Sequence, residues 1–167
     1  MRPTGDRARE AWMSIVNAFL PGARVLDLFA GSGALGLEAL SRGAASADFV
    51  EIDATSVRAI RENGAHLGAT DHMKIHRADA LRFAASLDTR SYDVAFADPP
   101  YGQGLAAKLA ALWLDRPFAG LLGVEHEGRD EMPPGGELRR YGRTAITIYR
   151  ATDGTAGGAG GMTGLPA

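Results

Sequence analysis

Hydrophobic residues along this chain switch between helical spacing and short continuous runs. From Asp6 to Leu20 they recur every three or four positions, which predicts an amphipathic helix that ends at Pro21 and Gly22. Short apolar runs bounded by turn residues predict strands at residues 24–29, 47–52, 73–76, 92–97 and 120–125. The segments between them predict helices at residues 32–42, 55–67 and 105–114, and a further helix that Asp79 opens.

Strands that alternate with helices predict a mostly parallel sheet with helices on both faces. Near the end of the chain, residues 138–141 and 144–150 flank Gly142 and Arg143, which predicts a β-hairpin and one antiparallel edge strand. The expected α/β fold is Rossmann-like and forms one domain over residues 1–150, with the segment and helix of residues 1–22 packed on the sheet. Residues 151–167 are rich in glycine, so we expect a disordered tail.

Composition narrows the classes of function. The 167 residues carry a net charge of −2, which argues against broad capture of naked nucleic acid, so any contact with nucleic acid must be local. Cysteine is absent and the 4 histidines lack the spacing of ligands, which predicts no metal site. No apolar run approaches the roughly 18 residues of a membrane span, so we expect a cytoplasmic protein without membrane contact.

The most informative motif, Asp98-Pro99-Pro100-Tyr101, directly follows the strand predicted at residues 92–97. Ligands of open α/β sheets bind just past the carboxyl ends of such strands. Two consecutive prolines stiffen the turn and remove two amide donors, which leaves carbonyl groups to accept hydrogen bonds. A carboxylate, a carbonyl and an aromatic ring together suit the exocyclic amine of a nucleobase.

A glycine-rich turn follows the first predicted strand. Gly31, Gly33 and Gly36 match the spacing G-x-G-x-x-G, which lets the backbone approach a nucleotide closely, and Glu51 follows about 20 residues on. Nicotinamide enzymes and S-adenosylmethionine enzymes share this pattern. Asp27, just before the turn, favours the second class, because a carboxylate would face a cationic amino acid group more favourably than a pyrophosphate. S-adenosylmethionine is therefore the cofactor that we expect.

Taken in order, these segments resemble one known family. The resemblance is to the RsmD-type bacterial 16S ribosomal RNA guanine-N2 methyltransferases, on residues 2–4, 6–7, 9–10, 25–44, 50–51, 79–80 and 98–101. The opening Arg-Pro-Thr-x-Asp-Arg-x-Arg-Glu segment is the part most particular to that family. The resemblance implies a class I methyltransferase fold with a seven-stranded sheet. It also implies methylation of the N2 amine of a guanine in 16S ribosomal RNA. We expect a monomer that acts on an assembling small ribosomal subunit, whose proteins would compensate for the weak basicity of this chain.

The same resemblance implies where the cofactor binds. S-adenosylmethionine would lie over the carboxyl ends of the first two strands, with Asp27 at the methionine ammonium, Glu51 at the ribose and Asp79 at the adenine amine. The remaining cofactor contacts would be Phe29, Gly31, Ser32, Gly33, Ile52 and Ala80.

The implied chemistry depends on orientation, because the lone pair of the guanine amine is delocalised into the ring. Asp98 and the carbonyl of Pro99 would each accept one N–H and aim the lone pair at the methyl group, and such alignment can be worth about 7–11 kcal/mol. After transfer the nitrogen is cationic, so an ordinary carboxylate or water can remove its proton. Tyr101 would stack on a base that is unpaired or flipped out of its helix.

Several of these residues have a structural alternative. Asp27 could accept hydrogen bonds from loop amides, and Tyr101 could serve only in packing. Either Glu51 or Asp53 could bind ribose while the other caps the following helix, and Glu51 is favoured for the ribose. Asp79 could cap its helix, with or without a cofactor contact.

Other functions also stay open. The chain could methylate another amine, such as adenine N6 in DNA or a protein glutamine amide. It could be a nicotinamide oxidoreductase, or an assembly factor that binds cofactor without catalysis. Members of the RsmD-type family carry a further basic amino-terminal segment, whereas this sequence opens directly at Met1 and Arg2. We therefore expect either a truncated start or RNA binding without that segment.

Overall fold

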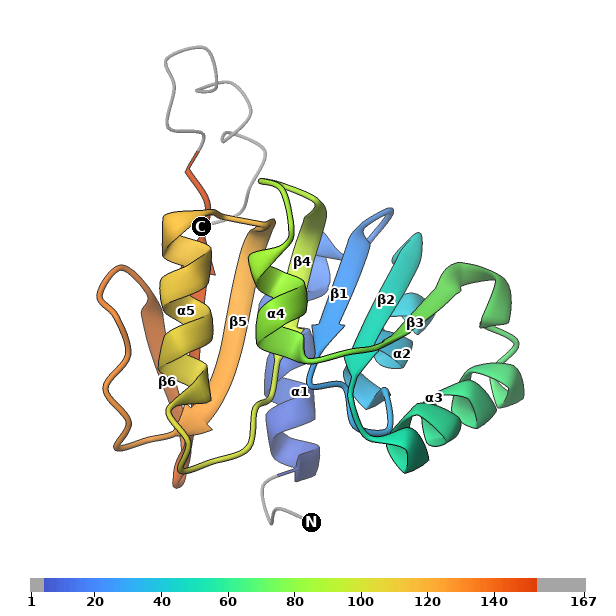
Figure 1. Cartoon of the computed structure of the whole chain (residues 1–167), viewed down its shortest axis with the longest axis horizontal. Coiled ribbons are helices and arrows are strands. Elements are labelled where there is room, and N and C mark those ends of the chain that lie inside the picture. Colours follow the sequence, from blue (N-terminus) through green and yellow to red (C-terminus); the bar gives the residue numbers. More distant parts are fainter. Residues whose placement is uncertain (1–4, 153–167) are drawn as a thin grey trace.

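A computed structural model describes residues 5–152 of the chain (Figure 1). Seven strands form one sheet in the order β3-β2-β1-β4-β5-β7-β6. Their bounds are β1 Arg24–Leu28, β2 Ser46–Glu51, β3 Met73–Arg77, β4 Tyr92–Ala97, β5 Ala119–Glu127, β6 Glu137–Tyr141 and β7 Thr144–Arg150. Strands β1 to β5 are parallel, and β7 runs antiparallel to both of its neighbours. The strand order reverses between β1 and β4, which is where open α/β sheets bind ligands.

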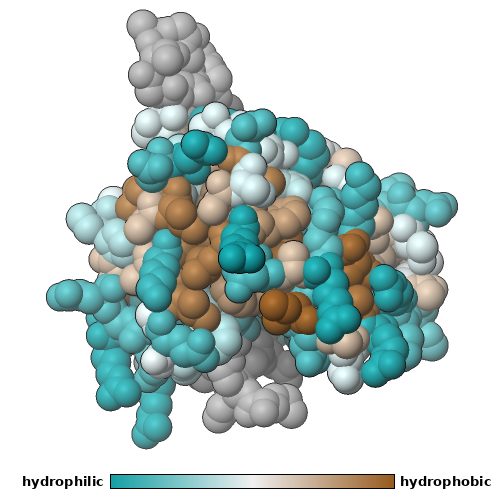
Figure 2. All heavy atoms as spheres, viewed as in Figure 1, coloured by the Kyte–Doolittle hydropathy of each residue, from teal (hydrophilic) through white to brown (hydrophobic). Residues whose placement is uncertain are grey.

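Helices cover both faces of this sheet (Figure 1). Helices α1, α2 and α3 contribute to one buried cluster, whereas α4 and α5 contribute to the other. The helices are α1 Gly5–Val16, α2 Ala34–Ser41, α3 Ala54–His66, α4 Ala80–Ala85 and α5 Leu105–Asp115, with short 3₁₀ turns at Asn17–Phe19 and Thr70–His72. On the face that carries α4 and α5, hydrophobic residues gather at the centre and hydrophilic ones at the rim (Figure 2). The predicted layers are confirmed.

The predicted elements form, but two of them differ in detail. The first helix was expected to reach Leu20, whereas it ends at Val16 and continues as a 3₁₀ turn. The hairpin was expected to place its antiparallel strand at the edge, which is wrong, because β7 lies between β5 and β6. Nearly every residue of β7 is buried, while β6 is exposed and charged. The apolar strand therefore takes the inner place, and the charged strand protects the edge.

The expected disordered tail begins too early at residue 151. Ala151 is buried, and its N–H donates to the carbonyl of Gly120 at 2.9 Å, so the ordered domain includes this residue. Residues 153–167 and the opening residues Arg2, Pro3 and Thr4 lie outside the described part of the chain.

Trp12 is the largest of the buried side chains that pack helix α1 on the sheet. Trp12 is fully buried and meets Phe96 of β4 edge to face, with ring centroids 5.3 Å apart. It also lies directly over Gly123 of β5, where an added Cβ would come 2.1 Å from the indole ring. Gly123 is therefore required by the close approach of the indole to the strand, because no larger residue fits beneath it.

We expect Gly123→Ala to destabilise the fold by about 1–3 kcal/mol, since overpacking forces the buried indole or the strand to shift. Urea unfolding followed by circular dichroism measures the change. Leu138→Ala on the exposed edge strand is the control and should change stability by less than about 0.5 kcal/mol. Equal stability of Gly123→Ala and the wild type would contradict the tight seat of Trp12.

Candidate active site

The register of four parallel strands brings three predicted site residues and one further acidic residue into one row. Val50 of β2 pairs with Leu28 of β1, Leu28 with Ala97 of β4, and Ala97 with Val124 of β5. The residues that follow these four are Glu51, Phe29, Asp98 and Glu125. Three carboxylates and one aromatic ring thus lie across the carboxyl edge of the sheet, at the reversal of strand order.

A cavity of about 210 Å³ opens at this edge. It is lined by residues of the glycine turn together with Asp27, Asp98, Glu125 and Arg9. The predicted cofactor loop and the predicted catalytic carboxylate therefore border the same space, although about seventy residues separate them in the sequence.

The turn between β1 and α2 has an uncommon backbone. Phe29 has φ 56°, which is rare for a residue with a side chain, while Gly31 and Gly33 have φ 58° and 84°. A Cβ added at Gly31 would meet nothing within 4 Å, so the backbone there faces open space. Ser32 is exposed, and its carbonyl accepts a hydrogen bond from Asn63 at 3.0 Å. The loop is shaped to let a ligand approach the main chain.

Asp27 is almost completely buried beneath this turn. Its Oδ2 accepts the N–H of Gly36, in the first turn of α2, at 2.9 Å, so Asp27 has a structural role, but with a helix amide rather than the loop amides considered from the sequence. Burial raises the pKa of Asp27 to about 8, and the neighbouring charge of Glu51 raises it further, against the opposing effect of the Gly36 hydrogen bond. Asp27 also lines the cavity, so its contact with the methionine ammonium stays a prediction.

Glu51 and Asp53 have different partners. Glu51 accepts the N–H of Gly31 at 2.8 Å through one oxygen and that of Asp53 at 2.9 Å through the other. Asp53 caps α3 by accepting the N–H of Ser56 at 2.9 Å, and this bond and the one from the Ser56 hydroxyl lower its pKa. Asp53 is thus the helix cap, and Glu51 connects the loop after β1 to the loop after β2, where a ribose is expected.

The adenine end of the predicted cofactor site is more exposed. Asp79 caps α4 by accepting the N–H of Arg82 at 3.0 Å, which is the structural role considered for it from the sequence. The next residue, Ala80, is buried. Ile52 is 60% exposed, so it presents an apolar side chain to solvent next to Glu51. An adenine ring is the expected cover for that side chain.

The motif after β4 is held by its tyrosine. Asp98 is half-buried and Pro99 is buried, while the hydroxyl of Tyr101 lies 2.9 Å from the Thr144 hydroxyl of β7. Residues 99–101 also line a second cavity of about 200 Å³. Tyr101 therefore packs through its hydroxyl end, and its stacking on a base stays a prediction.

Glu125 lines the candidate site, although the sequence did not predict it there. It is 4% exposed and lines both cavities, and its Oε1 accepts a hydrogen bond from Trp12 Nε1 at 3.3 Å. An acidic residue at the end of an apolar strand was the available signal. The neighbouring His126 is buried, with ring nitrogens 2.7 Å from the Thr147 hydroxyl and from the Glu127 carbonyl, so it serves the sheet.

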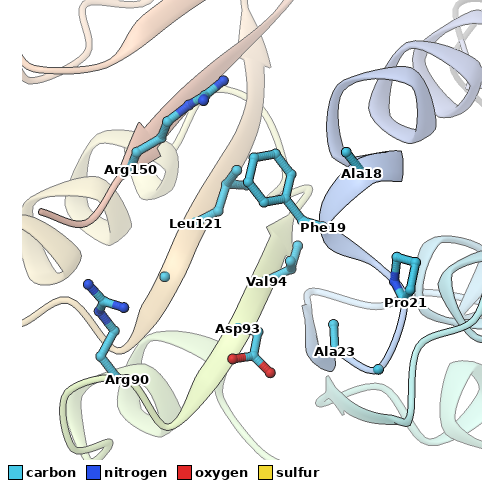
Figure 3. Close-up of a pocket in the computed structure, with 11 residues that line it drawn as sticks. Ala18, Phe19, Pro21, Ala23, Arg90, Asp93, Val94, Leu121 and Arg150 are labelled. Atoms are coloured by element: carbon cyan, nitrogen blue, oxygen red, sulfur yellow. The ribbon is translucent and has the colours of Figure 1, made fainter. Parts of the chain in front are cut away.

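A further cavity, of about 380 Å³, lies at the opposite edge of the sheet (Figure 3). Arg90 and Arg150 line it on one side, and Phe19 and Pro21 on the other. Since it opens beside the amino-terminal ends of β1, β4 and β5, it contains none of the predicted site residues.

Residues 5–152 contain no group of three or more histidine, aspartate or glutamate side chains that could hold a metal ion. No helix in this part of the chain is long and apolar enough to span a membrane.

The model of the family described as "Conserved hypothetical protein 95" matches residues 1–150. This chain belongs to that family. It is 37% identical over 159 residues to "Ribosomal RNA small subunit methyltransferase D" of Escherichia coli K12, covering 90% of this chain and 79% of that protein. The expected RsmD-type family is thereby confirmed.

Two further comparisons agree with this family. "Putative rRNA methyltransferase YlbH" of Bacillus subtilis is 34% identical over 160 residues, which cover 89% of this chain and 87% of that protein. The solved structure of "Putative methyltransferase yhhF" from Escherichia coli has a TM-score of 0.78 and 35% identity, covering 90% of this chain and 87% of that one. The expected class I methyltransferase fold is confirmed.

We expect Asp27→Asn to keep the fold of this family member, because the amide oxygen can still accept the Gly36 N–H. The folded wild type holds a proton up to a pH of about 8, whereas the unfolded carboxyl loses it near 3.8. The stability that Asp27 contributes is therefore present at low pH and is lost as the pH rises through this window. In thermal melts from pH 4 to 9, the melting temperature of the wild type should fall relative to that of the variant until about pH 8. A difference that does not change with pH would contradict the buried, protonated carboxyl.

Proposed function

We propose that this protein transfers a methyl group from S-adenosylmethionine to the N2 amine of a guanine in 16S ribosomal RNA. One observation carries the proposal: the glycine turn and Asp98 line the same cavity, so a methyl donor and an amine acceptor can meet there. The names of the relatives support ribosomal RNA as the substrate. The family resemblance supports guanine N2 as the methylated atom.

The residues present fit the cofactor. Solved RNA methyltransferases that share this fold hold AdoMet or S-adenosylhomocysteine. In this chain the open backbone at Gly31 admits a ligand, and Asp27 offers a carboxylate in the same cavity. Glu51 lies at the end of β2, where an acidic residue suits the two ribose hydroxyls. We assign these three residues to binding S-adenosylmethionine, which would supply an electrophilic methyl group.

Asp98 and Pro99 would hold the guanine amine. The stiff turn of residues 98–101 fixes a carboxylate and a carbonyl as two acceptors, one for each N–H, so that the nitrogen lone pair faces the methyl group. A carbon–nitrogen bond then forms as the carbon–sulfur bond breaks. The methylated nitrogen gives its extra proton to Asp98 or to water, and S-adenosylhomocysteine remains.

The RNA would be presented locally. A net charge of −2 provides little long-range attraction for naked RNA, so we propose that an assembling small ribosomal subunit is the substrate. The target base must leave its stack to reach a cavity at the sheet edge, and Tyr101 would support the extruded base. We further propose that the protein acts as a monomer in the cytoplasm and without a metal.

Asp98→Ala is expected to reduce methyl transfer at least about 100-fold, because orientation of the amine is lost. Radiolabelled S-adenosylmethionine is incubated with unmodified small subunits and with naked 16S RNA, and the product nucleosides are analysed. Asp115→Ala, at the exposed end of α5, is the control. Label in N2-methylguanosine that disappears only in Asp98→Ala supports the proposal. Label in another nucleoside or in protein, or no label despite binding of S-adenosylhomocysteine, would refute it.

A matched pair of variants tests the ribose assignment. Glu51→Gln should weaken binding of S-adenosylhomocysteine roughly 10-fold or more, since hydrogen bonds to a charged group are lost. Asp53→Ala should leave that affinity nearly unchanged and lower stability by about 1 kcal/mol, as expected for loss of a helix cap. Calorimetric titration and urea unfolding measure the two effects. Tight binding of oxidised NAD by the wild type would favour an oxidoreductase instead.

A further inference from the structure

Glu125 is a buried carboxylate that the proposed methyl transfer does not use. It is 4% exposed, and a buried charge is destabilising unless it has partners. Its Oε1 accepts a hydrogen bond from Trp12 at 3.3 Å, and a carboxylate offers about four acceptor sites, so Glu125 can accept from a ligand alongside its contacts within the protein.

The position of Glu125 suggests that it contacts the substrate base. It lines the cavity that Gly31 and Asp98 share, and it also lines the cavity bounded by Pro99 and Tyr101. The strand register places it beside Asp98, since each of these residues directly follows one member of a paired couple in β4 and β5. A base whose amine is bound by Asp98 would therefore have Glu125 next to the edge of the base that carries this amine.

The chemistry of that edge separates guanine from adenine. In guanine the N2 amine lies next to the N1–H, so the two groups present adjacent donors. In adenine the N6 amine lies next to N1, which is an acceptor. A carboxylate can only accept, so beside the amine it attracts the guanine edge and repels the adenine edge.

We infer that Glu125 accepts the N1–H of the target guanine and thereby selects guanine over adenine. This inference rests on the proposed function and adds to it the group that reads the base. Trp12 is then a positioning residue, because its indole fixes one oxygen of Glu125 without touching the base. This hydrogen bond connects helix α1 to the choice of substrate.

The first experiment changes the RNA. The methylated guanosine is mapped in the product, and an RNA is ligated with 2-aminopurine at that position. This base keeps the N2 amine but has an acceptor at N1. With the wild-type protein, kcat/KM should fall roughly 10- to 100-fold, as for a lost hydrogen bond to a charged group. Equal methylation of both bases would overturn the inference without any variant.

The second experiment changes the carboxylate. Glu125→Gln can donate its amide N–H to N1 of 2-aminopurine, so this variant should methylate 2-aminopurine better than guanine, the reverse of the wild type. Glu127→Gln is the matched control, since Glu127 lies on the same strand, pairs with Arg129 at 3.4 Å and lines neither cavity. It should keep the preference of the wild type.

The outcomes distinguish the inference from the proposed function. If the wild type methylates no guanine in unmodified small subunits, the proposed function fails and the inference fails with it. If it does so but Glu125→Gln loses activity equally on both bases while still binding S-adenosylhomocysteine, Glu125 is structural and only the inference fails. A reversed preference supports both.

Discussion

The contact of Trp12 with the sheet connects the helix at the start of the described chain to the site at the carboxyl edge. The indole packs against Phe96 of β4 and over Gly123 of β5, two residues from Asp98 and Glu125 respectively. Apolar burial of a whole tryptophan side chain drives this contact, and the single polar atom of the ring is satisfied by Glu125. Trp12 thus packs α1 on the sheet, together with Met13 and Val16, and also contacts Glu125 at the site.

Two carboxylates of the candidate site, Asp27 and Glu51, have structural contacts as well as expected contacts with the cofactor. Glu51 accepts a hydrogen bond from Gly31 of the glycine turn and Asp27 accepts one from Gly36 in the first turn of α2, so the carboxylates expected to bind the cofactor also stabilise the local backbone. A buried Asp27 favours its protonated form, which reduces repulsion from Glu51. A cationic ligand would reverse that preference, because it favours the ionised carboxylate. Cofactor affinity and loop order are therefore expected to depend on the same few groups.

The edge strands show how charge and burial select a place in the sheet. β7 is buried on both faces and pairs on both sides, whereas β6 carries Arg139 and Arg140 and stays exposed. Because β7 pairs directly with β5, Thr144 can reach Tyr101 and fix the loop after β4. The hairpin therefore supports the site from the side, although it contributes no predicted cofactor contact.

The alternation of short apolar runs with amphipathic segments determined the α/β fold, since periodicity of side chains depends only on neighbours along the chain. Helix caps could also be predicted from the sequence, as Asp79 was for α4 and Asp53 was as one alternative for α3. The register of β2, β1, β4 and β5 could not be predicted, because it depends on packing between residues far apart in sequence. Only the tertiary structure could therefore bring Glu125 next to Asp98, place β7 inside β6, and show that Asp27 is buried enough to hold a proton.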